Sequence, residues 1–286
     1  MLPFWISIVA LSLAQGALVA APGALAWRLP ARLRGRRWAL VPPLSVIAFV
    51  FGARAAERAS AQGLTYLALV AVPLLAALAL GWLLWSSRPS ARGRALLVVP
   101  LFALAWADRG GLAGDAGALA LSALSCAALG ALIATVTPPR WLAAGIVAMA
   151  CADTALVISD LLQRPNDALN AARPAAGLPQ LQSAVFGSAV MGYGDLFIAG
   201  ALGGLLAASV SRSTQLRAAA LTACLALLFD LLFFLVDELP ATVPVALALV
   251  VVSLRRDVRS AAAAGTLAGA PAGAGLARRR RTRPVP

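Results

Sequence analysis

The sequence contains no histidine and no lysine, and only 12% of its 286 residues are charged. The lack of histidine excludes Ser-His catalysis, Cys-His catalysis and the HExxH zinc site, because each needs an imidazole ring as base or ligand. The three cysteines, Cys126, Cys151 and Cys224, lie within apolar segments and have no CxxC spacing. We therefore expect small buried thiols, with no disulfide framework and no metal site.

Apolar residues make up 61% of the chain, and the mean hydropathy is +0.87. This composition leaves too little polar surface for a soluble domain and predicts an all-α, polytopic membrane protein. The formal net charge of +13 comes from 24 arginines, most of which lie in short loops and in the tail beside apolar runs. That placement favours membrane orientation and contact with anionic lipid over binding of nucleic acid.

Nine apolar runs predict nine transmembrane helices. They cover about residues 4–26, 38–53, 64–85, 95–107, 116–136, 141–162, 184–210, 218–236 and 240–254, with the start of the seventh between Ala184 and Ala189. The transmembrane domain is therefore expected over residues 1–259, with helices one to six in 4–162 and helices seven to nine in 184–254. Residues 260–286, ending in RRRRTRPVP, are predicted to be a disordered basic tail. A cleaved signal peptide is the alternative for the first run, although MLPFW lacks a basic n-region.

The arginines predict the orientation of the chain. The loops after helices one, three, five, seven and nine, together with the tail, hold 19 of them, and the opposite loops hold five. The positive-inside rule then predicts that the N-terminus lies outside the cell and the C-terminus in the cytoplasm. We expect a multi-pass protein of the plasma membrane.

Two carboxylates, Asp153 and Asp195, interrupt consecutive apolar runs. An ionisable group at that depth costs about 2.5 to 3.5 kcal/mol on insertion scales, so each is a functional hypothesis. At about 1.5 Å per residue, Asp153 lies about 13 Å from the outer end of helix six, and Asp195 about 9 to 16 Å from the outer start of helix seven. The two can share a level in the membrane, whereas Asp160 would lie only about 3 Å below the surface.

Two carboxylates at one level in a poorly solvated site cannot both ionise easily, so they share a proton. The charged member can take a proton from a water that attacks a peptide carbonyl, and the protonated member can donate to the carbonyl oxygen. This chemistry needs no metal and no organic cofactor, and none is predicted. Gly192 and Gly194 would let an extended peptide approach closely. The PATVP segment, 240–244, would keep the start of helix nine irregular, with an edge that can pair with substrate backbone.

The GYGD sequence at 192–195 resembles the GxGD motif of the presenilin and signal peptide peptidase family of intramembrane aspartyl proteases. Asp153 occupies the place of that family's first catalytic aspartate, and the segment from Pro240 resembles its PAL motif. The motifs cover about residues 141–254, and the nine helices match the family's architecture. The resemblance implies a presenilin-like bundle that cleaves membrane-spanning peptides or signal-peptide remnants, with Asp153 and Asp195 catalytic. It also implies substrate contacts from Gly192, Tyr193, Gly194, Pro240, Ala241 and Thr242.

The chain departs from the family pattern at three positions. Ala152 stands where the family usually has tyrosine, Thr242 replaces the leucine of PAL, and Asp230 is a third acid in an apolar run. The expected orientation is similar to that of signal peptide peptidase. Prepilin peptidases share a GxGD-type motif, but neither their cytoplasmic cysteine cluster nor the lysine after the aspartate is present here.

Structural roles remain as alternatives for several of these residues. Asp160 and Asp230 are interpreted as interfacial or interhelical hydrogen-bonding groups. Tyr193 fits a packing role, and Pro240 fits an ordinary helix start. For the whole protein, one alternative is a proton-coupled transporter or channel in which Asp153, Asp195 and Asp230 relay protons or bind a cation. The other is a catalytically inactive family member that only binds membrane segments.

Overall fold

The computed structural model of the protein describes residues 2–23, 34–55, 57–83, 89–236 and 239–268. Within these ranges the chain is mostly helical and contains one short hairpin of two strands. The helices are α1 (Phe4–Ala20), α2 (Val41–Ala55), α3 (Glu57–Leu78), α4 (Val98–Ala107), α5 (Leu112–Val136), α6 (Pro139–Ile158), α7 (Gln163–Ala171), α8 (Tyr193–Ser209), α9 (Arg212–Asp230) and α10 (Val243–Ala268). The strands are β1 (Ser183–Phe186) and β2 (Ala189–Gly192). The chain divides into a compact unit, Met1–Leu249, and a second unit, Val250–Pro286.

The prediction of a helical protein with membrane-type helices is confirmed. In the described part of the chain, four helical stretches are long and apolar enough to cross a membrane: Ala59–Gly81, Leu112–Val136, Pro139–Ile158 and Arg212–Phe234. Four further apolar helices are shorter, at 10 to 17 residues: Phe4–Ala20, Gly93–Ala107, Tyr193–Ser209 and Val243–Arg255. Each of the nine predicted runs overlaps one α-helix of the structure, although the bounds differ. Nine crossings of the membrane stay a prediction.

The first unit exposes large apolar side chains and buries small and polar ones. Along α3, Leu67, Val70 and Leu74 are each more than 60% exposed and lie on one face of the helix. The buried set includes many alanines and several polar residues, among them Ser12, Gln15, Ser122, Ser125, Gln215 and Thr222. In water an exposed apolar stripe of this kind is unfavourable, but it suits contact with lipid. Small residues at helix contacts are typical of membrane proteins.

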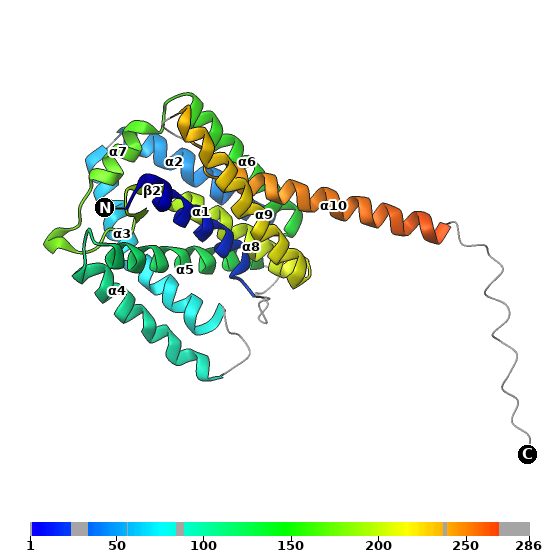
Figure 1. Cartoon of the computed structure of the whole chain (residues 1–286), viewed down its shortest axis with the longest axis horizontal. Coiled ribbons are helices and arrows are strands. Elements are labelled where there is room, and N and C mark those ends of the chain that lie inside the picture. The colour runs from blue at the N-terminus through cyan, green and yellow to red at the C-terminus, as the bar shows by residue number, and fades with distance from the viewer. Residues whose placement is uncertain (1, 24–33, 56, 84–88, 237–238, 269–286) are drawn as a thin grey trace, which may run out of the picture. The chain divides into compact units, whose positions relative to one another are not determined.

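Helix α5 packs against α8 through glycines (Figure 1). A Cβ added at Gly200 would clash with the backbone carbonyl of Cys126, and one added at Gly130 would clash with the backbone of Gly200. Gly204, one turn further along α8, lies against the Gly130 carbonyl. This GxxxG spacing lets the two backbones touch. On its other sides α5 contacts α3 and α4, and α8 also contacts α1 and α6.

The predicted start of helix seven was wrong. The segment that we assigned to its first turns, 184–192, forms the hairpin instead, and the helix begins at Tyr193. Phe186 pairs with Ala189, so the turn has two residues and begins with Gly187, whose φ is 60°. A two-residue hairpin loop needs positive φ in this place, which glycine adopts without steric cost. Asp195 therefore lies in the first turn of α8 rather than 9 to 16 Å along it.

The connection before the hairpin is more ordered than predicted, because it contains α7 at 163–171. At the other end of the chain, α10 continues to Ala268 and so enters the segment predicted to be a disordered tail. Several predicted features fall outside the described residues: the end of the first apolar run, Arg28, Arg32, Arg88, Asp237, Glu238 and the RRRRTRPVP terminus.

Candidate active site

Asp195 lies at the junction between β2 and α8. Its Oδ2 accepts a hydrogen bond of 3.1 Å from the backbone N–H of Gly192, the residue that precedes the helix. The first turn of a helix carries partial positive charge, so both interactions favour a carboxylate here. A Cβ at Gly192 would lie 2.9 Å from Oδ2, and glycine is thus the residue that leaves this carboxylate undisturbed. A Cβ at Gly194 would contact only the Cε of Met149, at 3.7 Å.

Asp153 lies on α6 and is buried. The hydroxyl of Thr242 donates a hydrogen bond of 2.7 Å to its Oδ2. Thr242 immediately precedes α10, and its carbonyl accepts the N–H of Ala246, so it is the N-terminal cap residue of that helix. Asp153 therefore faces the N-terminus of α10, just as Asp195 lies at the N-terminus of α8. Both carboxylates are held where helix dipoles favour negative charge.

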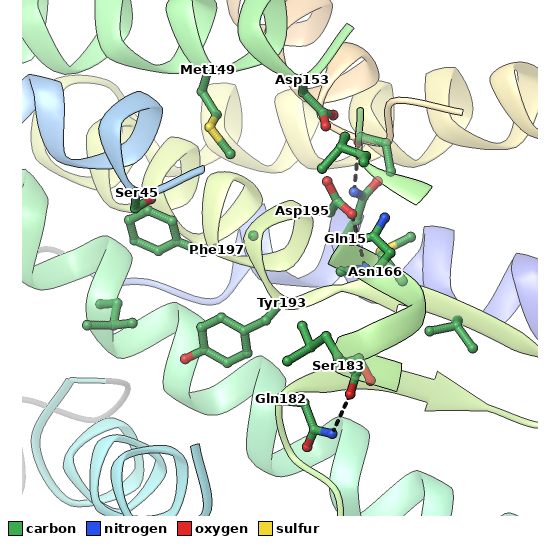
Figure 2. A pocket seen from close by; sticks show the side chains of 18 of the residues that line it. Gln15, Ser45, Met149, Asp153, Asn166, Gln182, Ser183, Tyr193, Asp195 and Phe197 are labelled. Carbon is green, nitrogen blue, oxygen red and sulfur yellow. Dashed lines mark hydrogen bonds between the residues drawn. The ribbon is translucent and has the colours of Figure 1, made fainter. Parts of the chain in front are cut away.

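The two carboxylates line one cavity of about 1010 Å³. Figure 2 shows both side chains pointing into this space, one from α6 and the other from the start of α8. The cavity is as large as the pockets that proteins use for sizeable ligands, and its lining is mostly apolar with a few polar groups. An arrangement of this kind can hold a water and a polypeptide segment against two acids.

Helix α1 supports the segment that contains Thr242. The side-chain Nε2 of Gln15 donates a hydrogen bond of 3.0 Å to the carbonyl of Ala241. Gln15 is fully buried and also lines the cavity, and its Oε1 has no hydrogen-bond partner in the described structure. Sequence analysis missed this residue. The signal that could have found it is an amide side chain within the otherwise apolar run LSLAQGALVA.

The residues predicted to contact substrate divide into two groups. Gly192, Tyr193, Gly194 and Ala241 line the cavity. Pro240 and Thr242 are buried and are not part of its lining, and Thr242 is turned toward Asp153.

Tyr193 is bonded to α5 through its side chain. Its hydroxyl pairs with the Oγ of Ser125 at 2.7 Å, and Figure 2 shows the ring directed away from the two aspartates. The ring also packs against the apolar cluster around Leu121. These contacts match the packing role more closely than direct contact between the hydroxyl and a bound peptide.

The other acids differ in their surroundings. Asp160 is exposed, adopts a φ of 54° beyond the end of α6, and is not among the described residues that line the cavity. Asp230 lines the cavity and accepts a hydrogen bond of 2.6 Å from Ser12, which joins α9 to α1. In the part of the chain that the structure describes, no three acid, cysteine or histidine side chains are grouped as metal ligands would be.

No family model, no curated protein and no solved structure matches this chain. The function must therefore be argued from the chemistry of the cavity and its two carboxylates.

Proposed function

We propose that the protein is an intramembrane aspartyl protease, an endopeptidase that hydrolyses peptide bonds within transmembrane segments or signal-peptide remnants. One observation carries the proposal: Asp153 and Asp195 come from different helices and line the same cavity. The GxGD resemblance supports the same assignment. The two residues are separated by 42 positions in the chain, so their convergence is a property of the fold.

In the proposed reaction one carboxylate is charged and the other carries a proton. The charged group takes a proton from a water between them as that water attacks the peptide carbonyl, and the protonated group donates to the carbonyl oxygen to give a gem-diol. The first group then gives its proton to the amide nitrogen as the C–N bond breaks, and the second group takes a proton back from the diol, which leaves the new carboxyl group and restores the pair. Thr242 and the Gly192 N–H keep the two carboxylates in place during this exchange. No cofactor is needed for these steps.

The substrate would enter as an extended strand. The hairpin ends at Gly192, three residues before Asp195, and in the described sheet β2 pairs with a strand on one edge only, so its other edge could take a peptide near the proposed catalytic group. A peptide that adds to this edge gains backbone hydrogen bonds. It is also held in an extended conformation, which leaves the scissile bond accessible. Gly194 leaves space on the cavity side for such an approach.

The architecture we propose is a presenilin-like bundle of nine transmembrane helices in the plasma membrane. Its N-terminus would lie outside and its C-terminus in the cytoplasm, with arginines of the loops and tail against anionic lipid. Its partners would be membrane-spanning peptides, and nucleic acid would not be one of them.

The test is cleavage of a membrane-spanning reporter by the purified protein in liposomes. Asp153→Asn and Asp195→Asn should each lower the cleavage rate at least about a hundredfold, because each removes a general acid or base. Asp160→Asn is the matched control: it deletes an exposed carboxylate, and asparagine also tolerates the positive φ of that position. The control should cleave at the wild-type rate. Cleavage that survives both substitutions in the cavity would refute the proposal.

A second function, a proton-coupled transporter or channel, is favoured by the third carboxylate in the same cavity, Asp230. The same liposomes separate the two functions, since a transporter moves protons or solute in the absence of any cleavage. A catalytically inactive family member would bind the reporter and leave it intact.

A further inference from the structure

The cavity has a charge opposite to that of the chain. The protein has 24 arginines and 11 acidic residues. Nevertheless, the described residues that line the cavity include four acids, Asp153, Asp167, Asp195 and Asp230, and no arginine. A cavity lined by one sign of charge with apolar walls focuses a negative potential and attracts cations.

Asp230 takes no part in the proposed chemistry. It lies near the C-terminal end of the Arg212–Phe234 helical stretch, where the helix dipole does not favour negative charge. Its Oδ2 is bound by the hydroxyl of Ser12, and no arginine in the described part of the chain forms an ion pair with it. A carboxylate held in this way, inside a cavity, is available to a ligand.

Helix α1 brings a second acceptor to the same cavity, on the helix face that carries Ser12. Ser12 and Gln15 are three residues apart, so they lie on the same face of α1, about 4.5 Å apart along its axis. Gln15 is fully buried, its Nε2 is bound to Ala241, and its Oε1 has no partner. A buried acceptor without a donor is unfavourable, and a ligand that brings a donor would relieve that cost.

We propose that Asp230 and the Oε1 of Gln15 form a subsite that binds a basic side chain of the peptide substrate. This inference rests on the proposed protease function and names the class of substrate. Both groups are acceptors, and a guanidinium or ammonium group offers several donors together with the opposite charge. A site of buried polar groups also discriminates strongly against a substrate that lacks the matching group.

The contacts of Gln15 place the basic residue near the scissile bond. The side chain of Gln15 donates a hydrogen bond to the carbonyl of Ala241, and the hydroxyl of the next residue, Thr242, donates one to Asp153. We therefore expect the basic residue to lie close to the cleaved bond in the peptide sequence.

The experiment compares synthetic transmembrane peptides that carry arginine or citrulline at successive positions around the cleavage site. Citrulline has nearly the same shape as arginine but no charge. With wild-type protein in liposomes, arginine at one position should lower KM about tenfold relative to citrulline, as expected for one charge-assisted hydrogen-bonded pair. Asp230→Asn should abolish this preference, so that the arginine and citrulline peptides are cleaved with the same KM. Asp160→Asn should retain the preference.

Two further variants make the test independent of a folding defect. Asp230→Glu keeps the charge and should keep the preference for arginine, whereas Asp230→Arg should transfer the preference to a peptide with glutamate at the same position. Cleavage without any preference for arginine, or a preference that persists in Asp230→Asn, would overturn the subsite and leave the protease proposal intact.

Absence of cleavage of any peptide would count against the protease proposal, and binding would then decide on the subsite. Fluorescence anisotropy of the same peptides with wild-type protein and Asp230→Asn measures it. Tighter binding of the arginine peptide that is lost in the variant supports the subsite, and equal binding of both peptides rejects it.

Discussion

At the scale of single residues, the departure of Thr242 from the family pattern has a physical role. The PAL motif has leucine at this position, and leucine cannot donate a hydrogen bond. Here the hydroxyl donates to Asp153 at 2.7 Å, within a buried environment where such a bond is strengthened. The threonine at this position thus provides an anchor for Asp153.

Thr242→Val keeps the shape of the side chain and removes the donor, so it should lower kcat about tenfold to a hundredfold, the equivalent of a hydrogen bond to a charged group. Thr242→Ser keeps the hydroxyl and should retain most of the activity. Initial rates on the reporter, with thermal unfolding midpoints as a check on folding, give the comparison. Equal rates for the valine and serine variants would show that the bond has no part in catalysis.

Asp153 and Asp195 could be predicted as a pair because few physical reasons place a carboxylate in an apolar run. The long-range hydrogen bonds that support Asp153 and the segment beside it could not. The contact from Thr242 spans 89 positions and that from Gln15 spans 226, and nothing local in the sequence specifies either. Gln15 and Ser12 resemble polar residues that occur singly in membrane helices, and only the packing of α1 against α9 gives them a common cavity.

At the scale of elements, the hydrophobic periodicity located the helices but not the hairpin. The segment from Ser183 to Gly192 is apolar, short and adjacent to a long apolar run, so hydropathy extends the helix through it. What separates the two is the turn at Gly187, and a single glycine in an apolar segment is weak evidence for a turn. Similarly, the sequence does not predict α7, because Pro165 and the polar residues around it obscure the helical pattern.

The glycines of α8 make a prediction about packing. Gly200→Ala inserts a methyl group against the carbonyl of Cys126, where the backbones of two helices touch, and should lower the free energy of unfolding by about 1 to 3 kcal/mol. Gly63→Ala is the matched control, because no atom lies within 4 Å of its added Cβ and the residue is exposed on α3. There alanine should be neutral or stabilise the helix by about 0.5 to 1 kcal/mol. Thermal unfolding in detergent measures both, and equal effects would contradict the close contact.

At the scale of the whole molecule, large apolar side chains lie at the surface and small ones at the helix contacts, an arrangement that suits a protein surrounded by lipid. Lipid is as apolar as leucine, so large side chains gain nothing by burial there, and helices associate through small residues and interhelical hydrogen bonds. The exposed leucines of α3 and the glycine contact of α5 with α8 fit this rule. The apolar composition predicted membrane helices for the same reason. The number of crossings could not be predicted in this way, because it depends on whether the short helices span the bilayer.

Helix α8 is the decisive case for the topology. Its 17 residues extend about 26 Å, somewhat less than a hydrocarbon core of about 30 Å, and the hairpin precedes it. If α8 crosses, the segments on its two sides face opposite compartments, and Asp195 lies within a few ångströms of the outer boundary of the core. Water can reach it there more readily than at the centre of the bilayer, which is a requirement for hydrolysis.

Single cysteines test this crossing in a background in which Cys126, Cys151 and Cys224 are replaced by alanine. Ala171→Cys, at the exposed end of α7, should react with an impermeant maleimide on intact cells, because the arginine distribution places that connection outside. Ser213→Cys, exposed at the start of α9, should react only after permeabilisation. Labelling of both from the same side would mean that α8 does not span the membrane. The dyad would then lie at the surface, and cleavage within the bilayer would be excluded even if the two carboxylates remain catalytic.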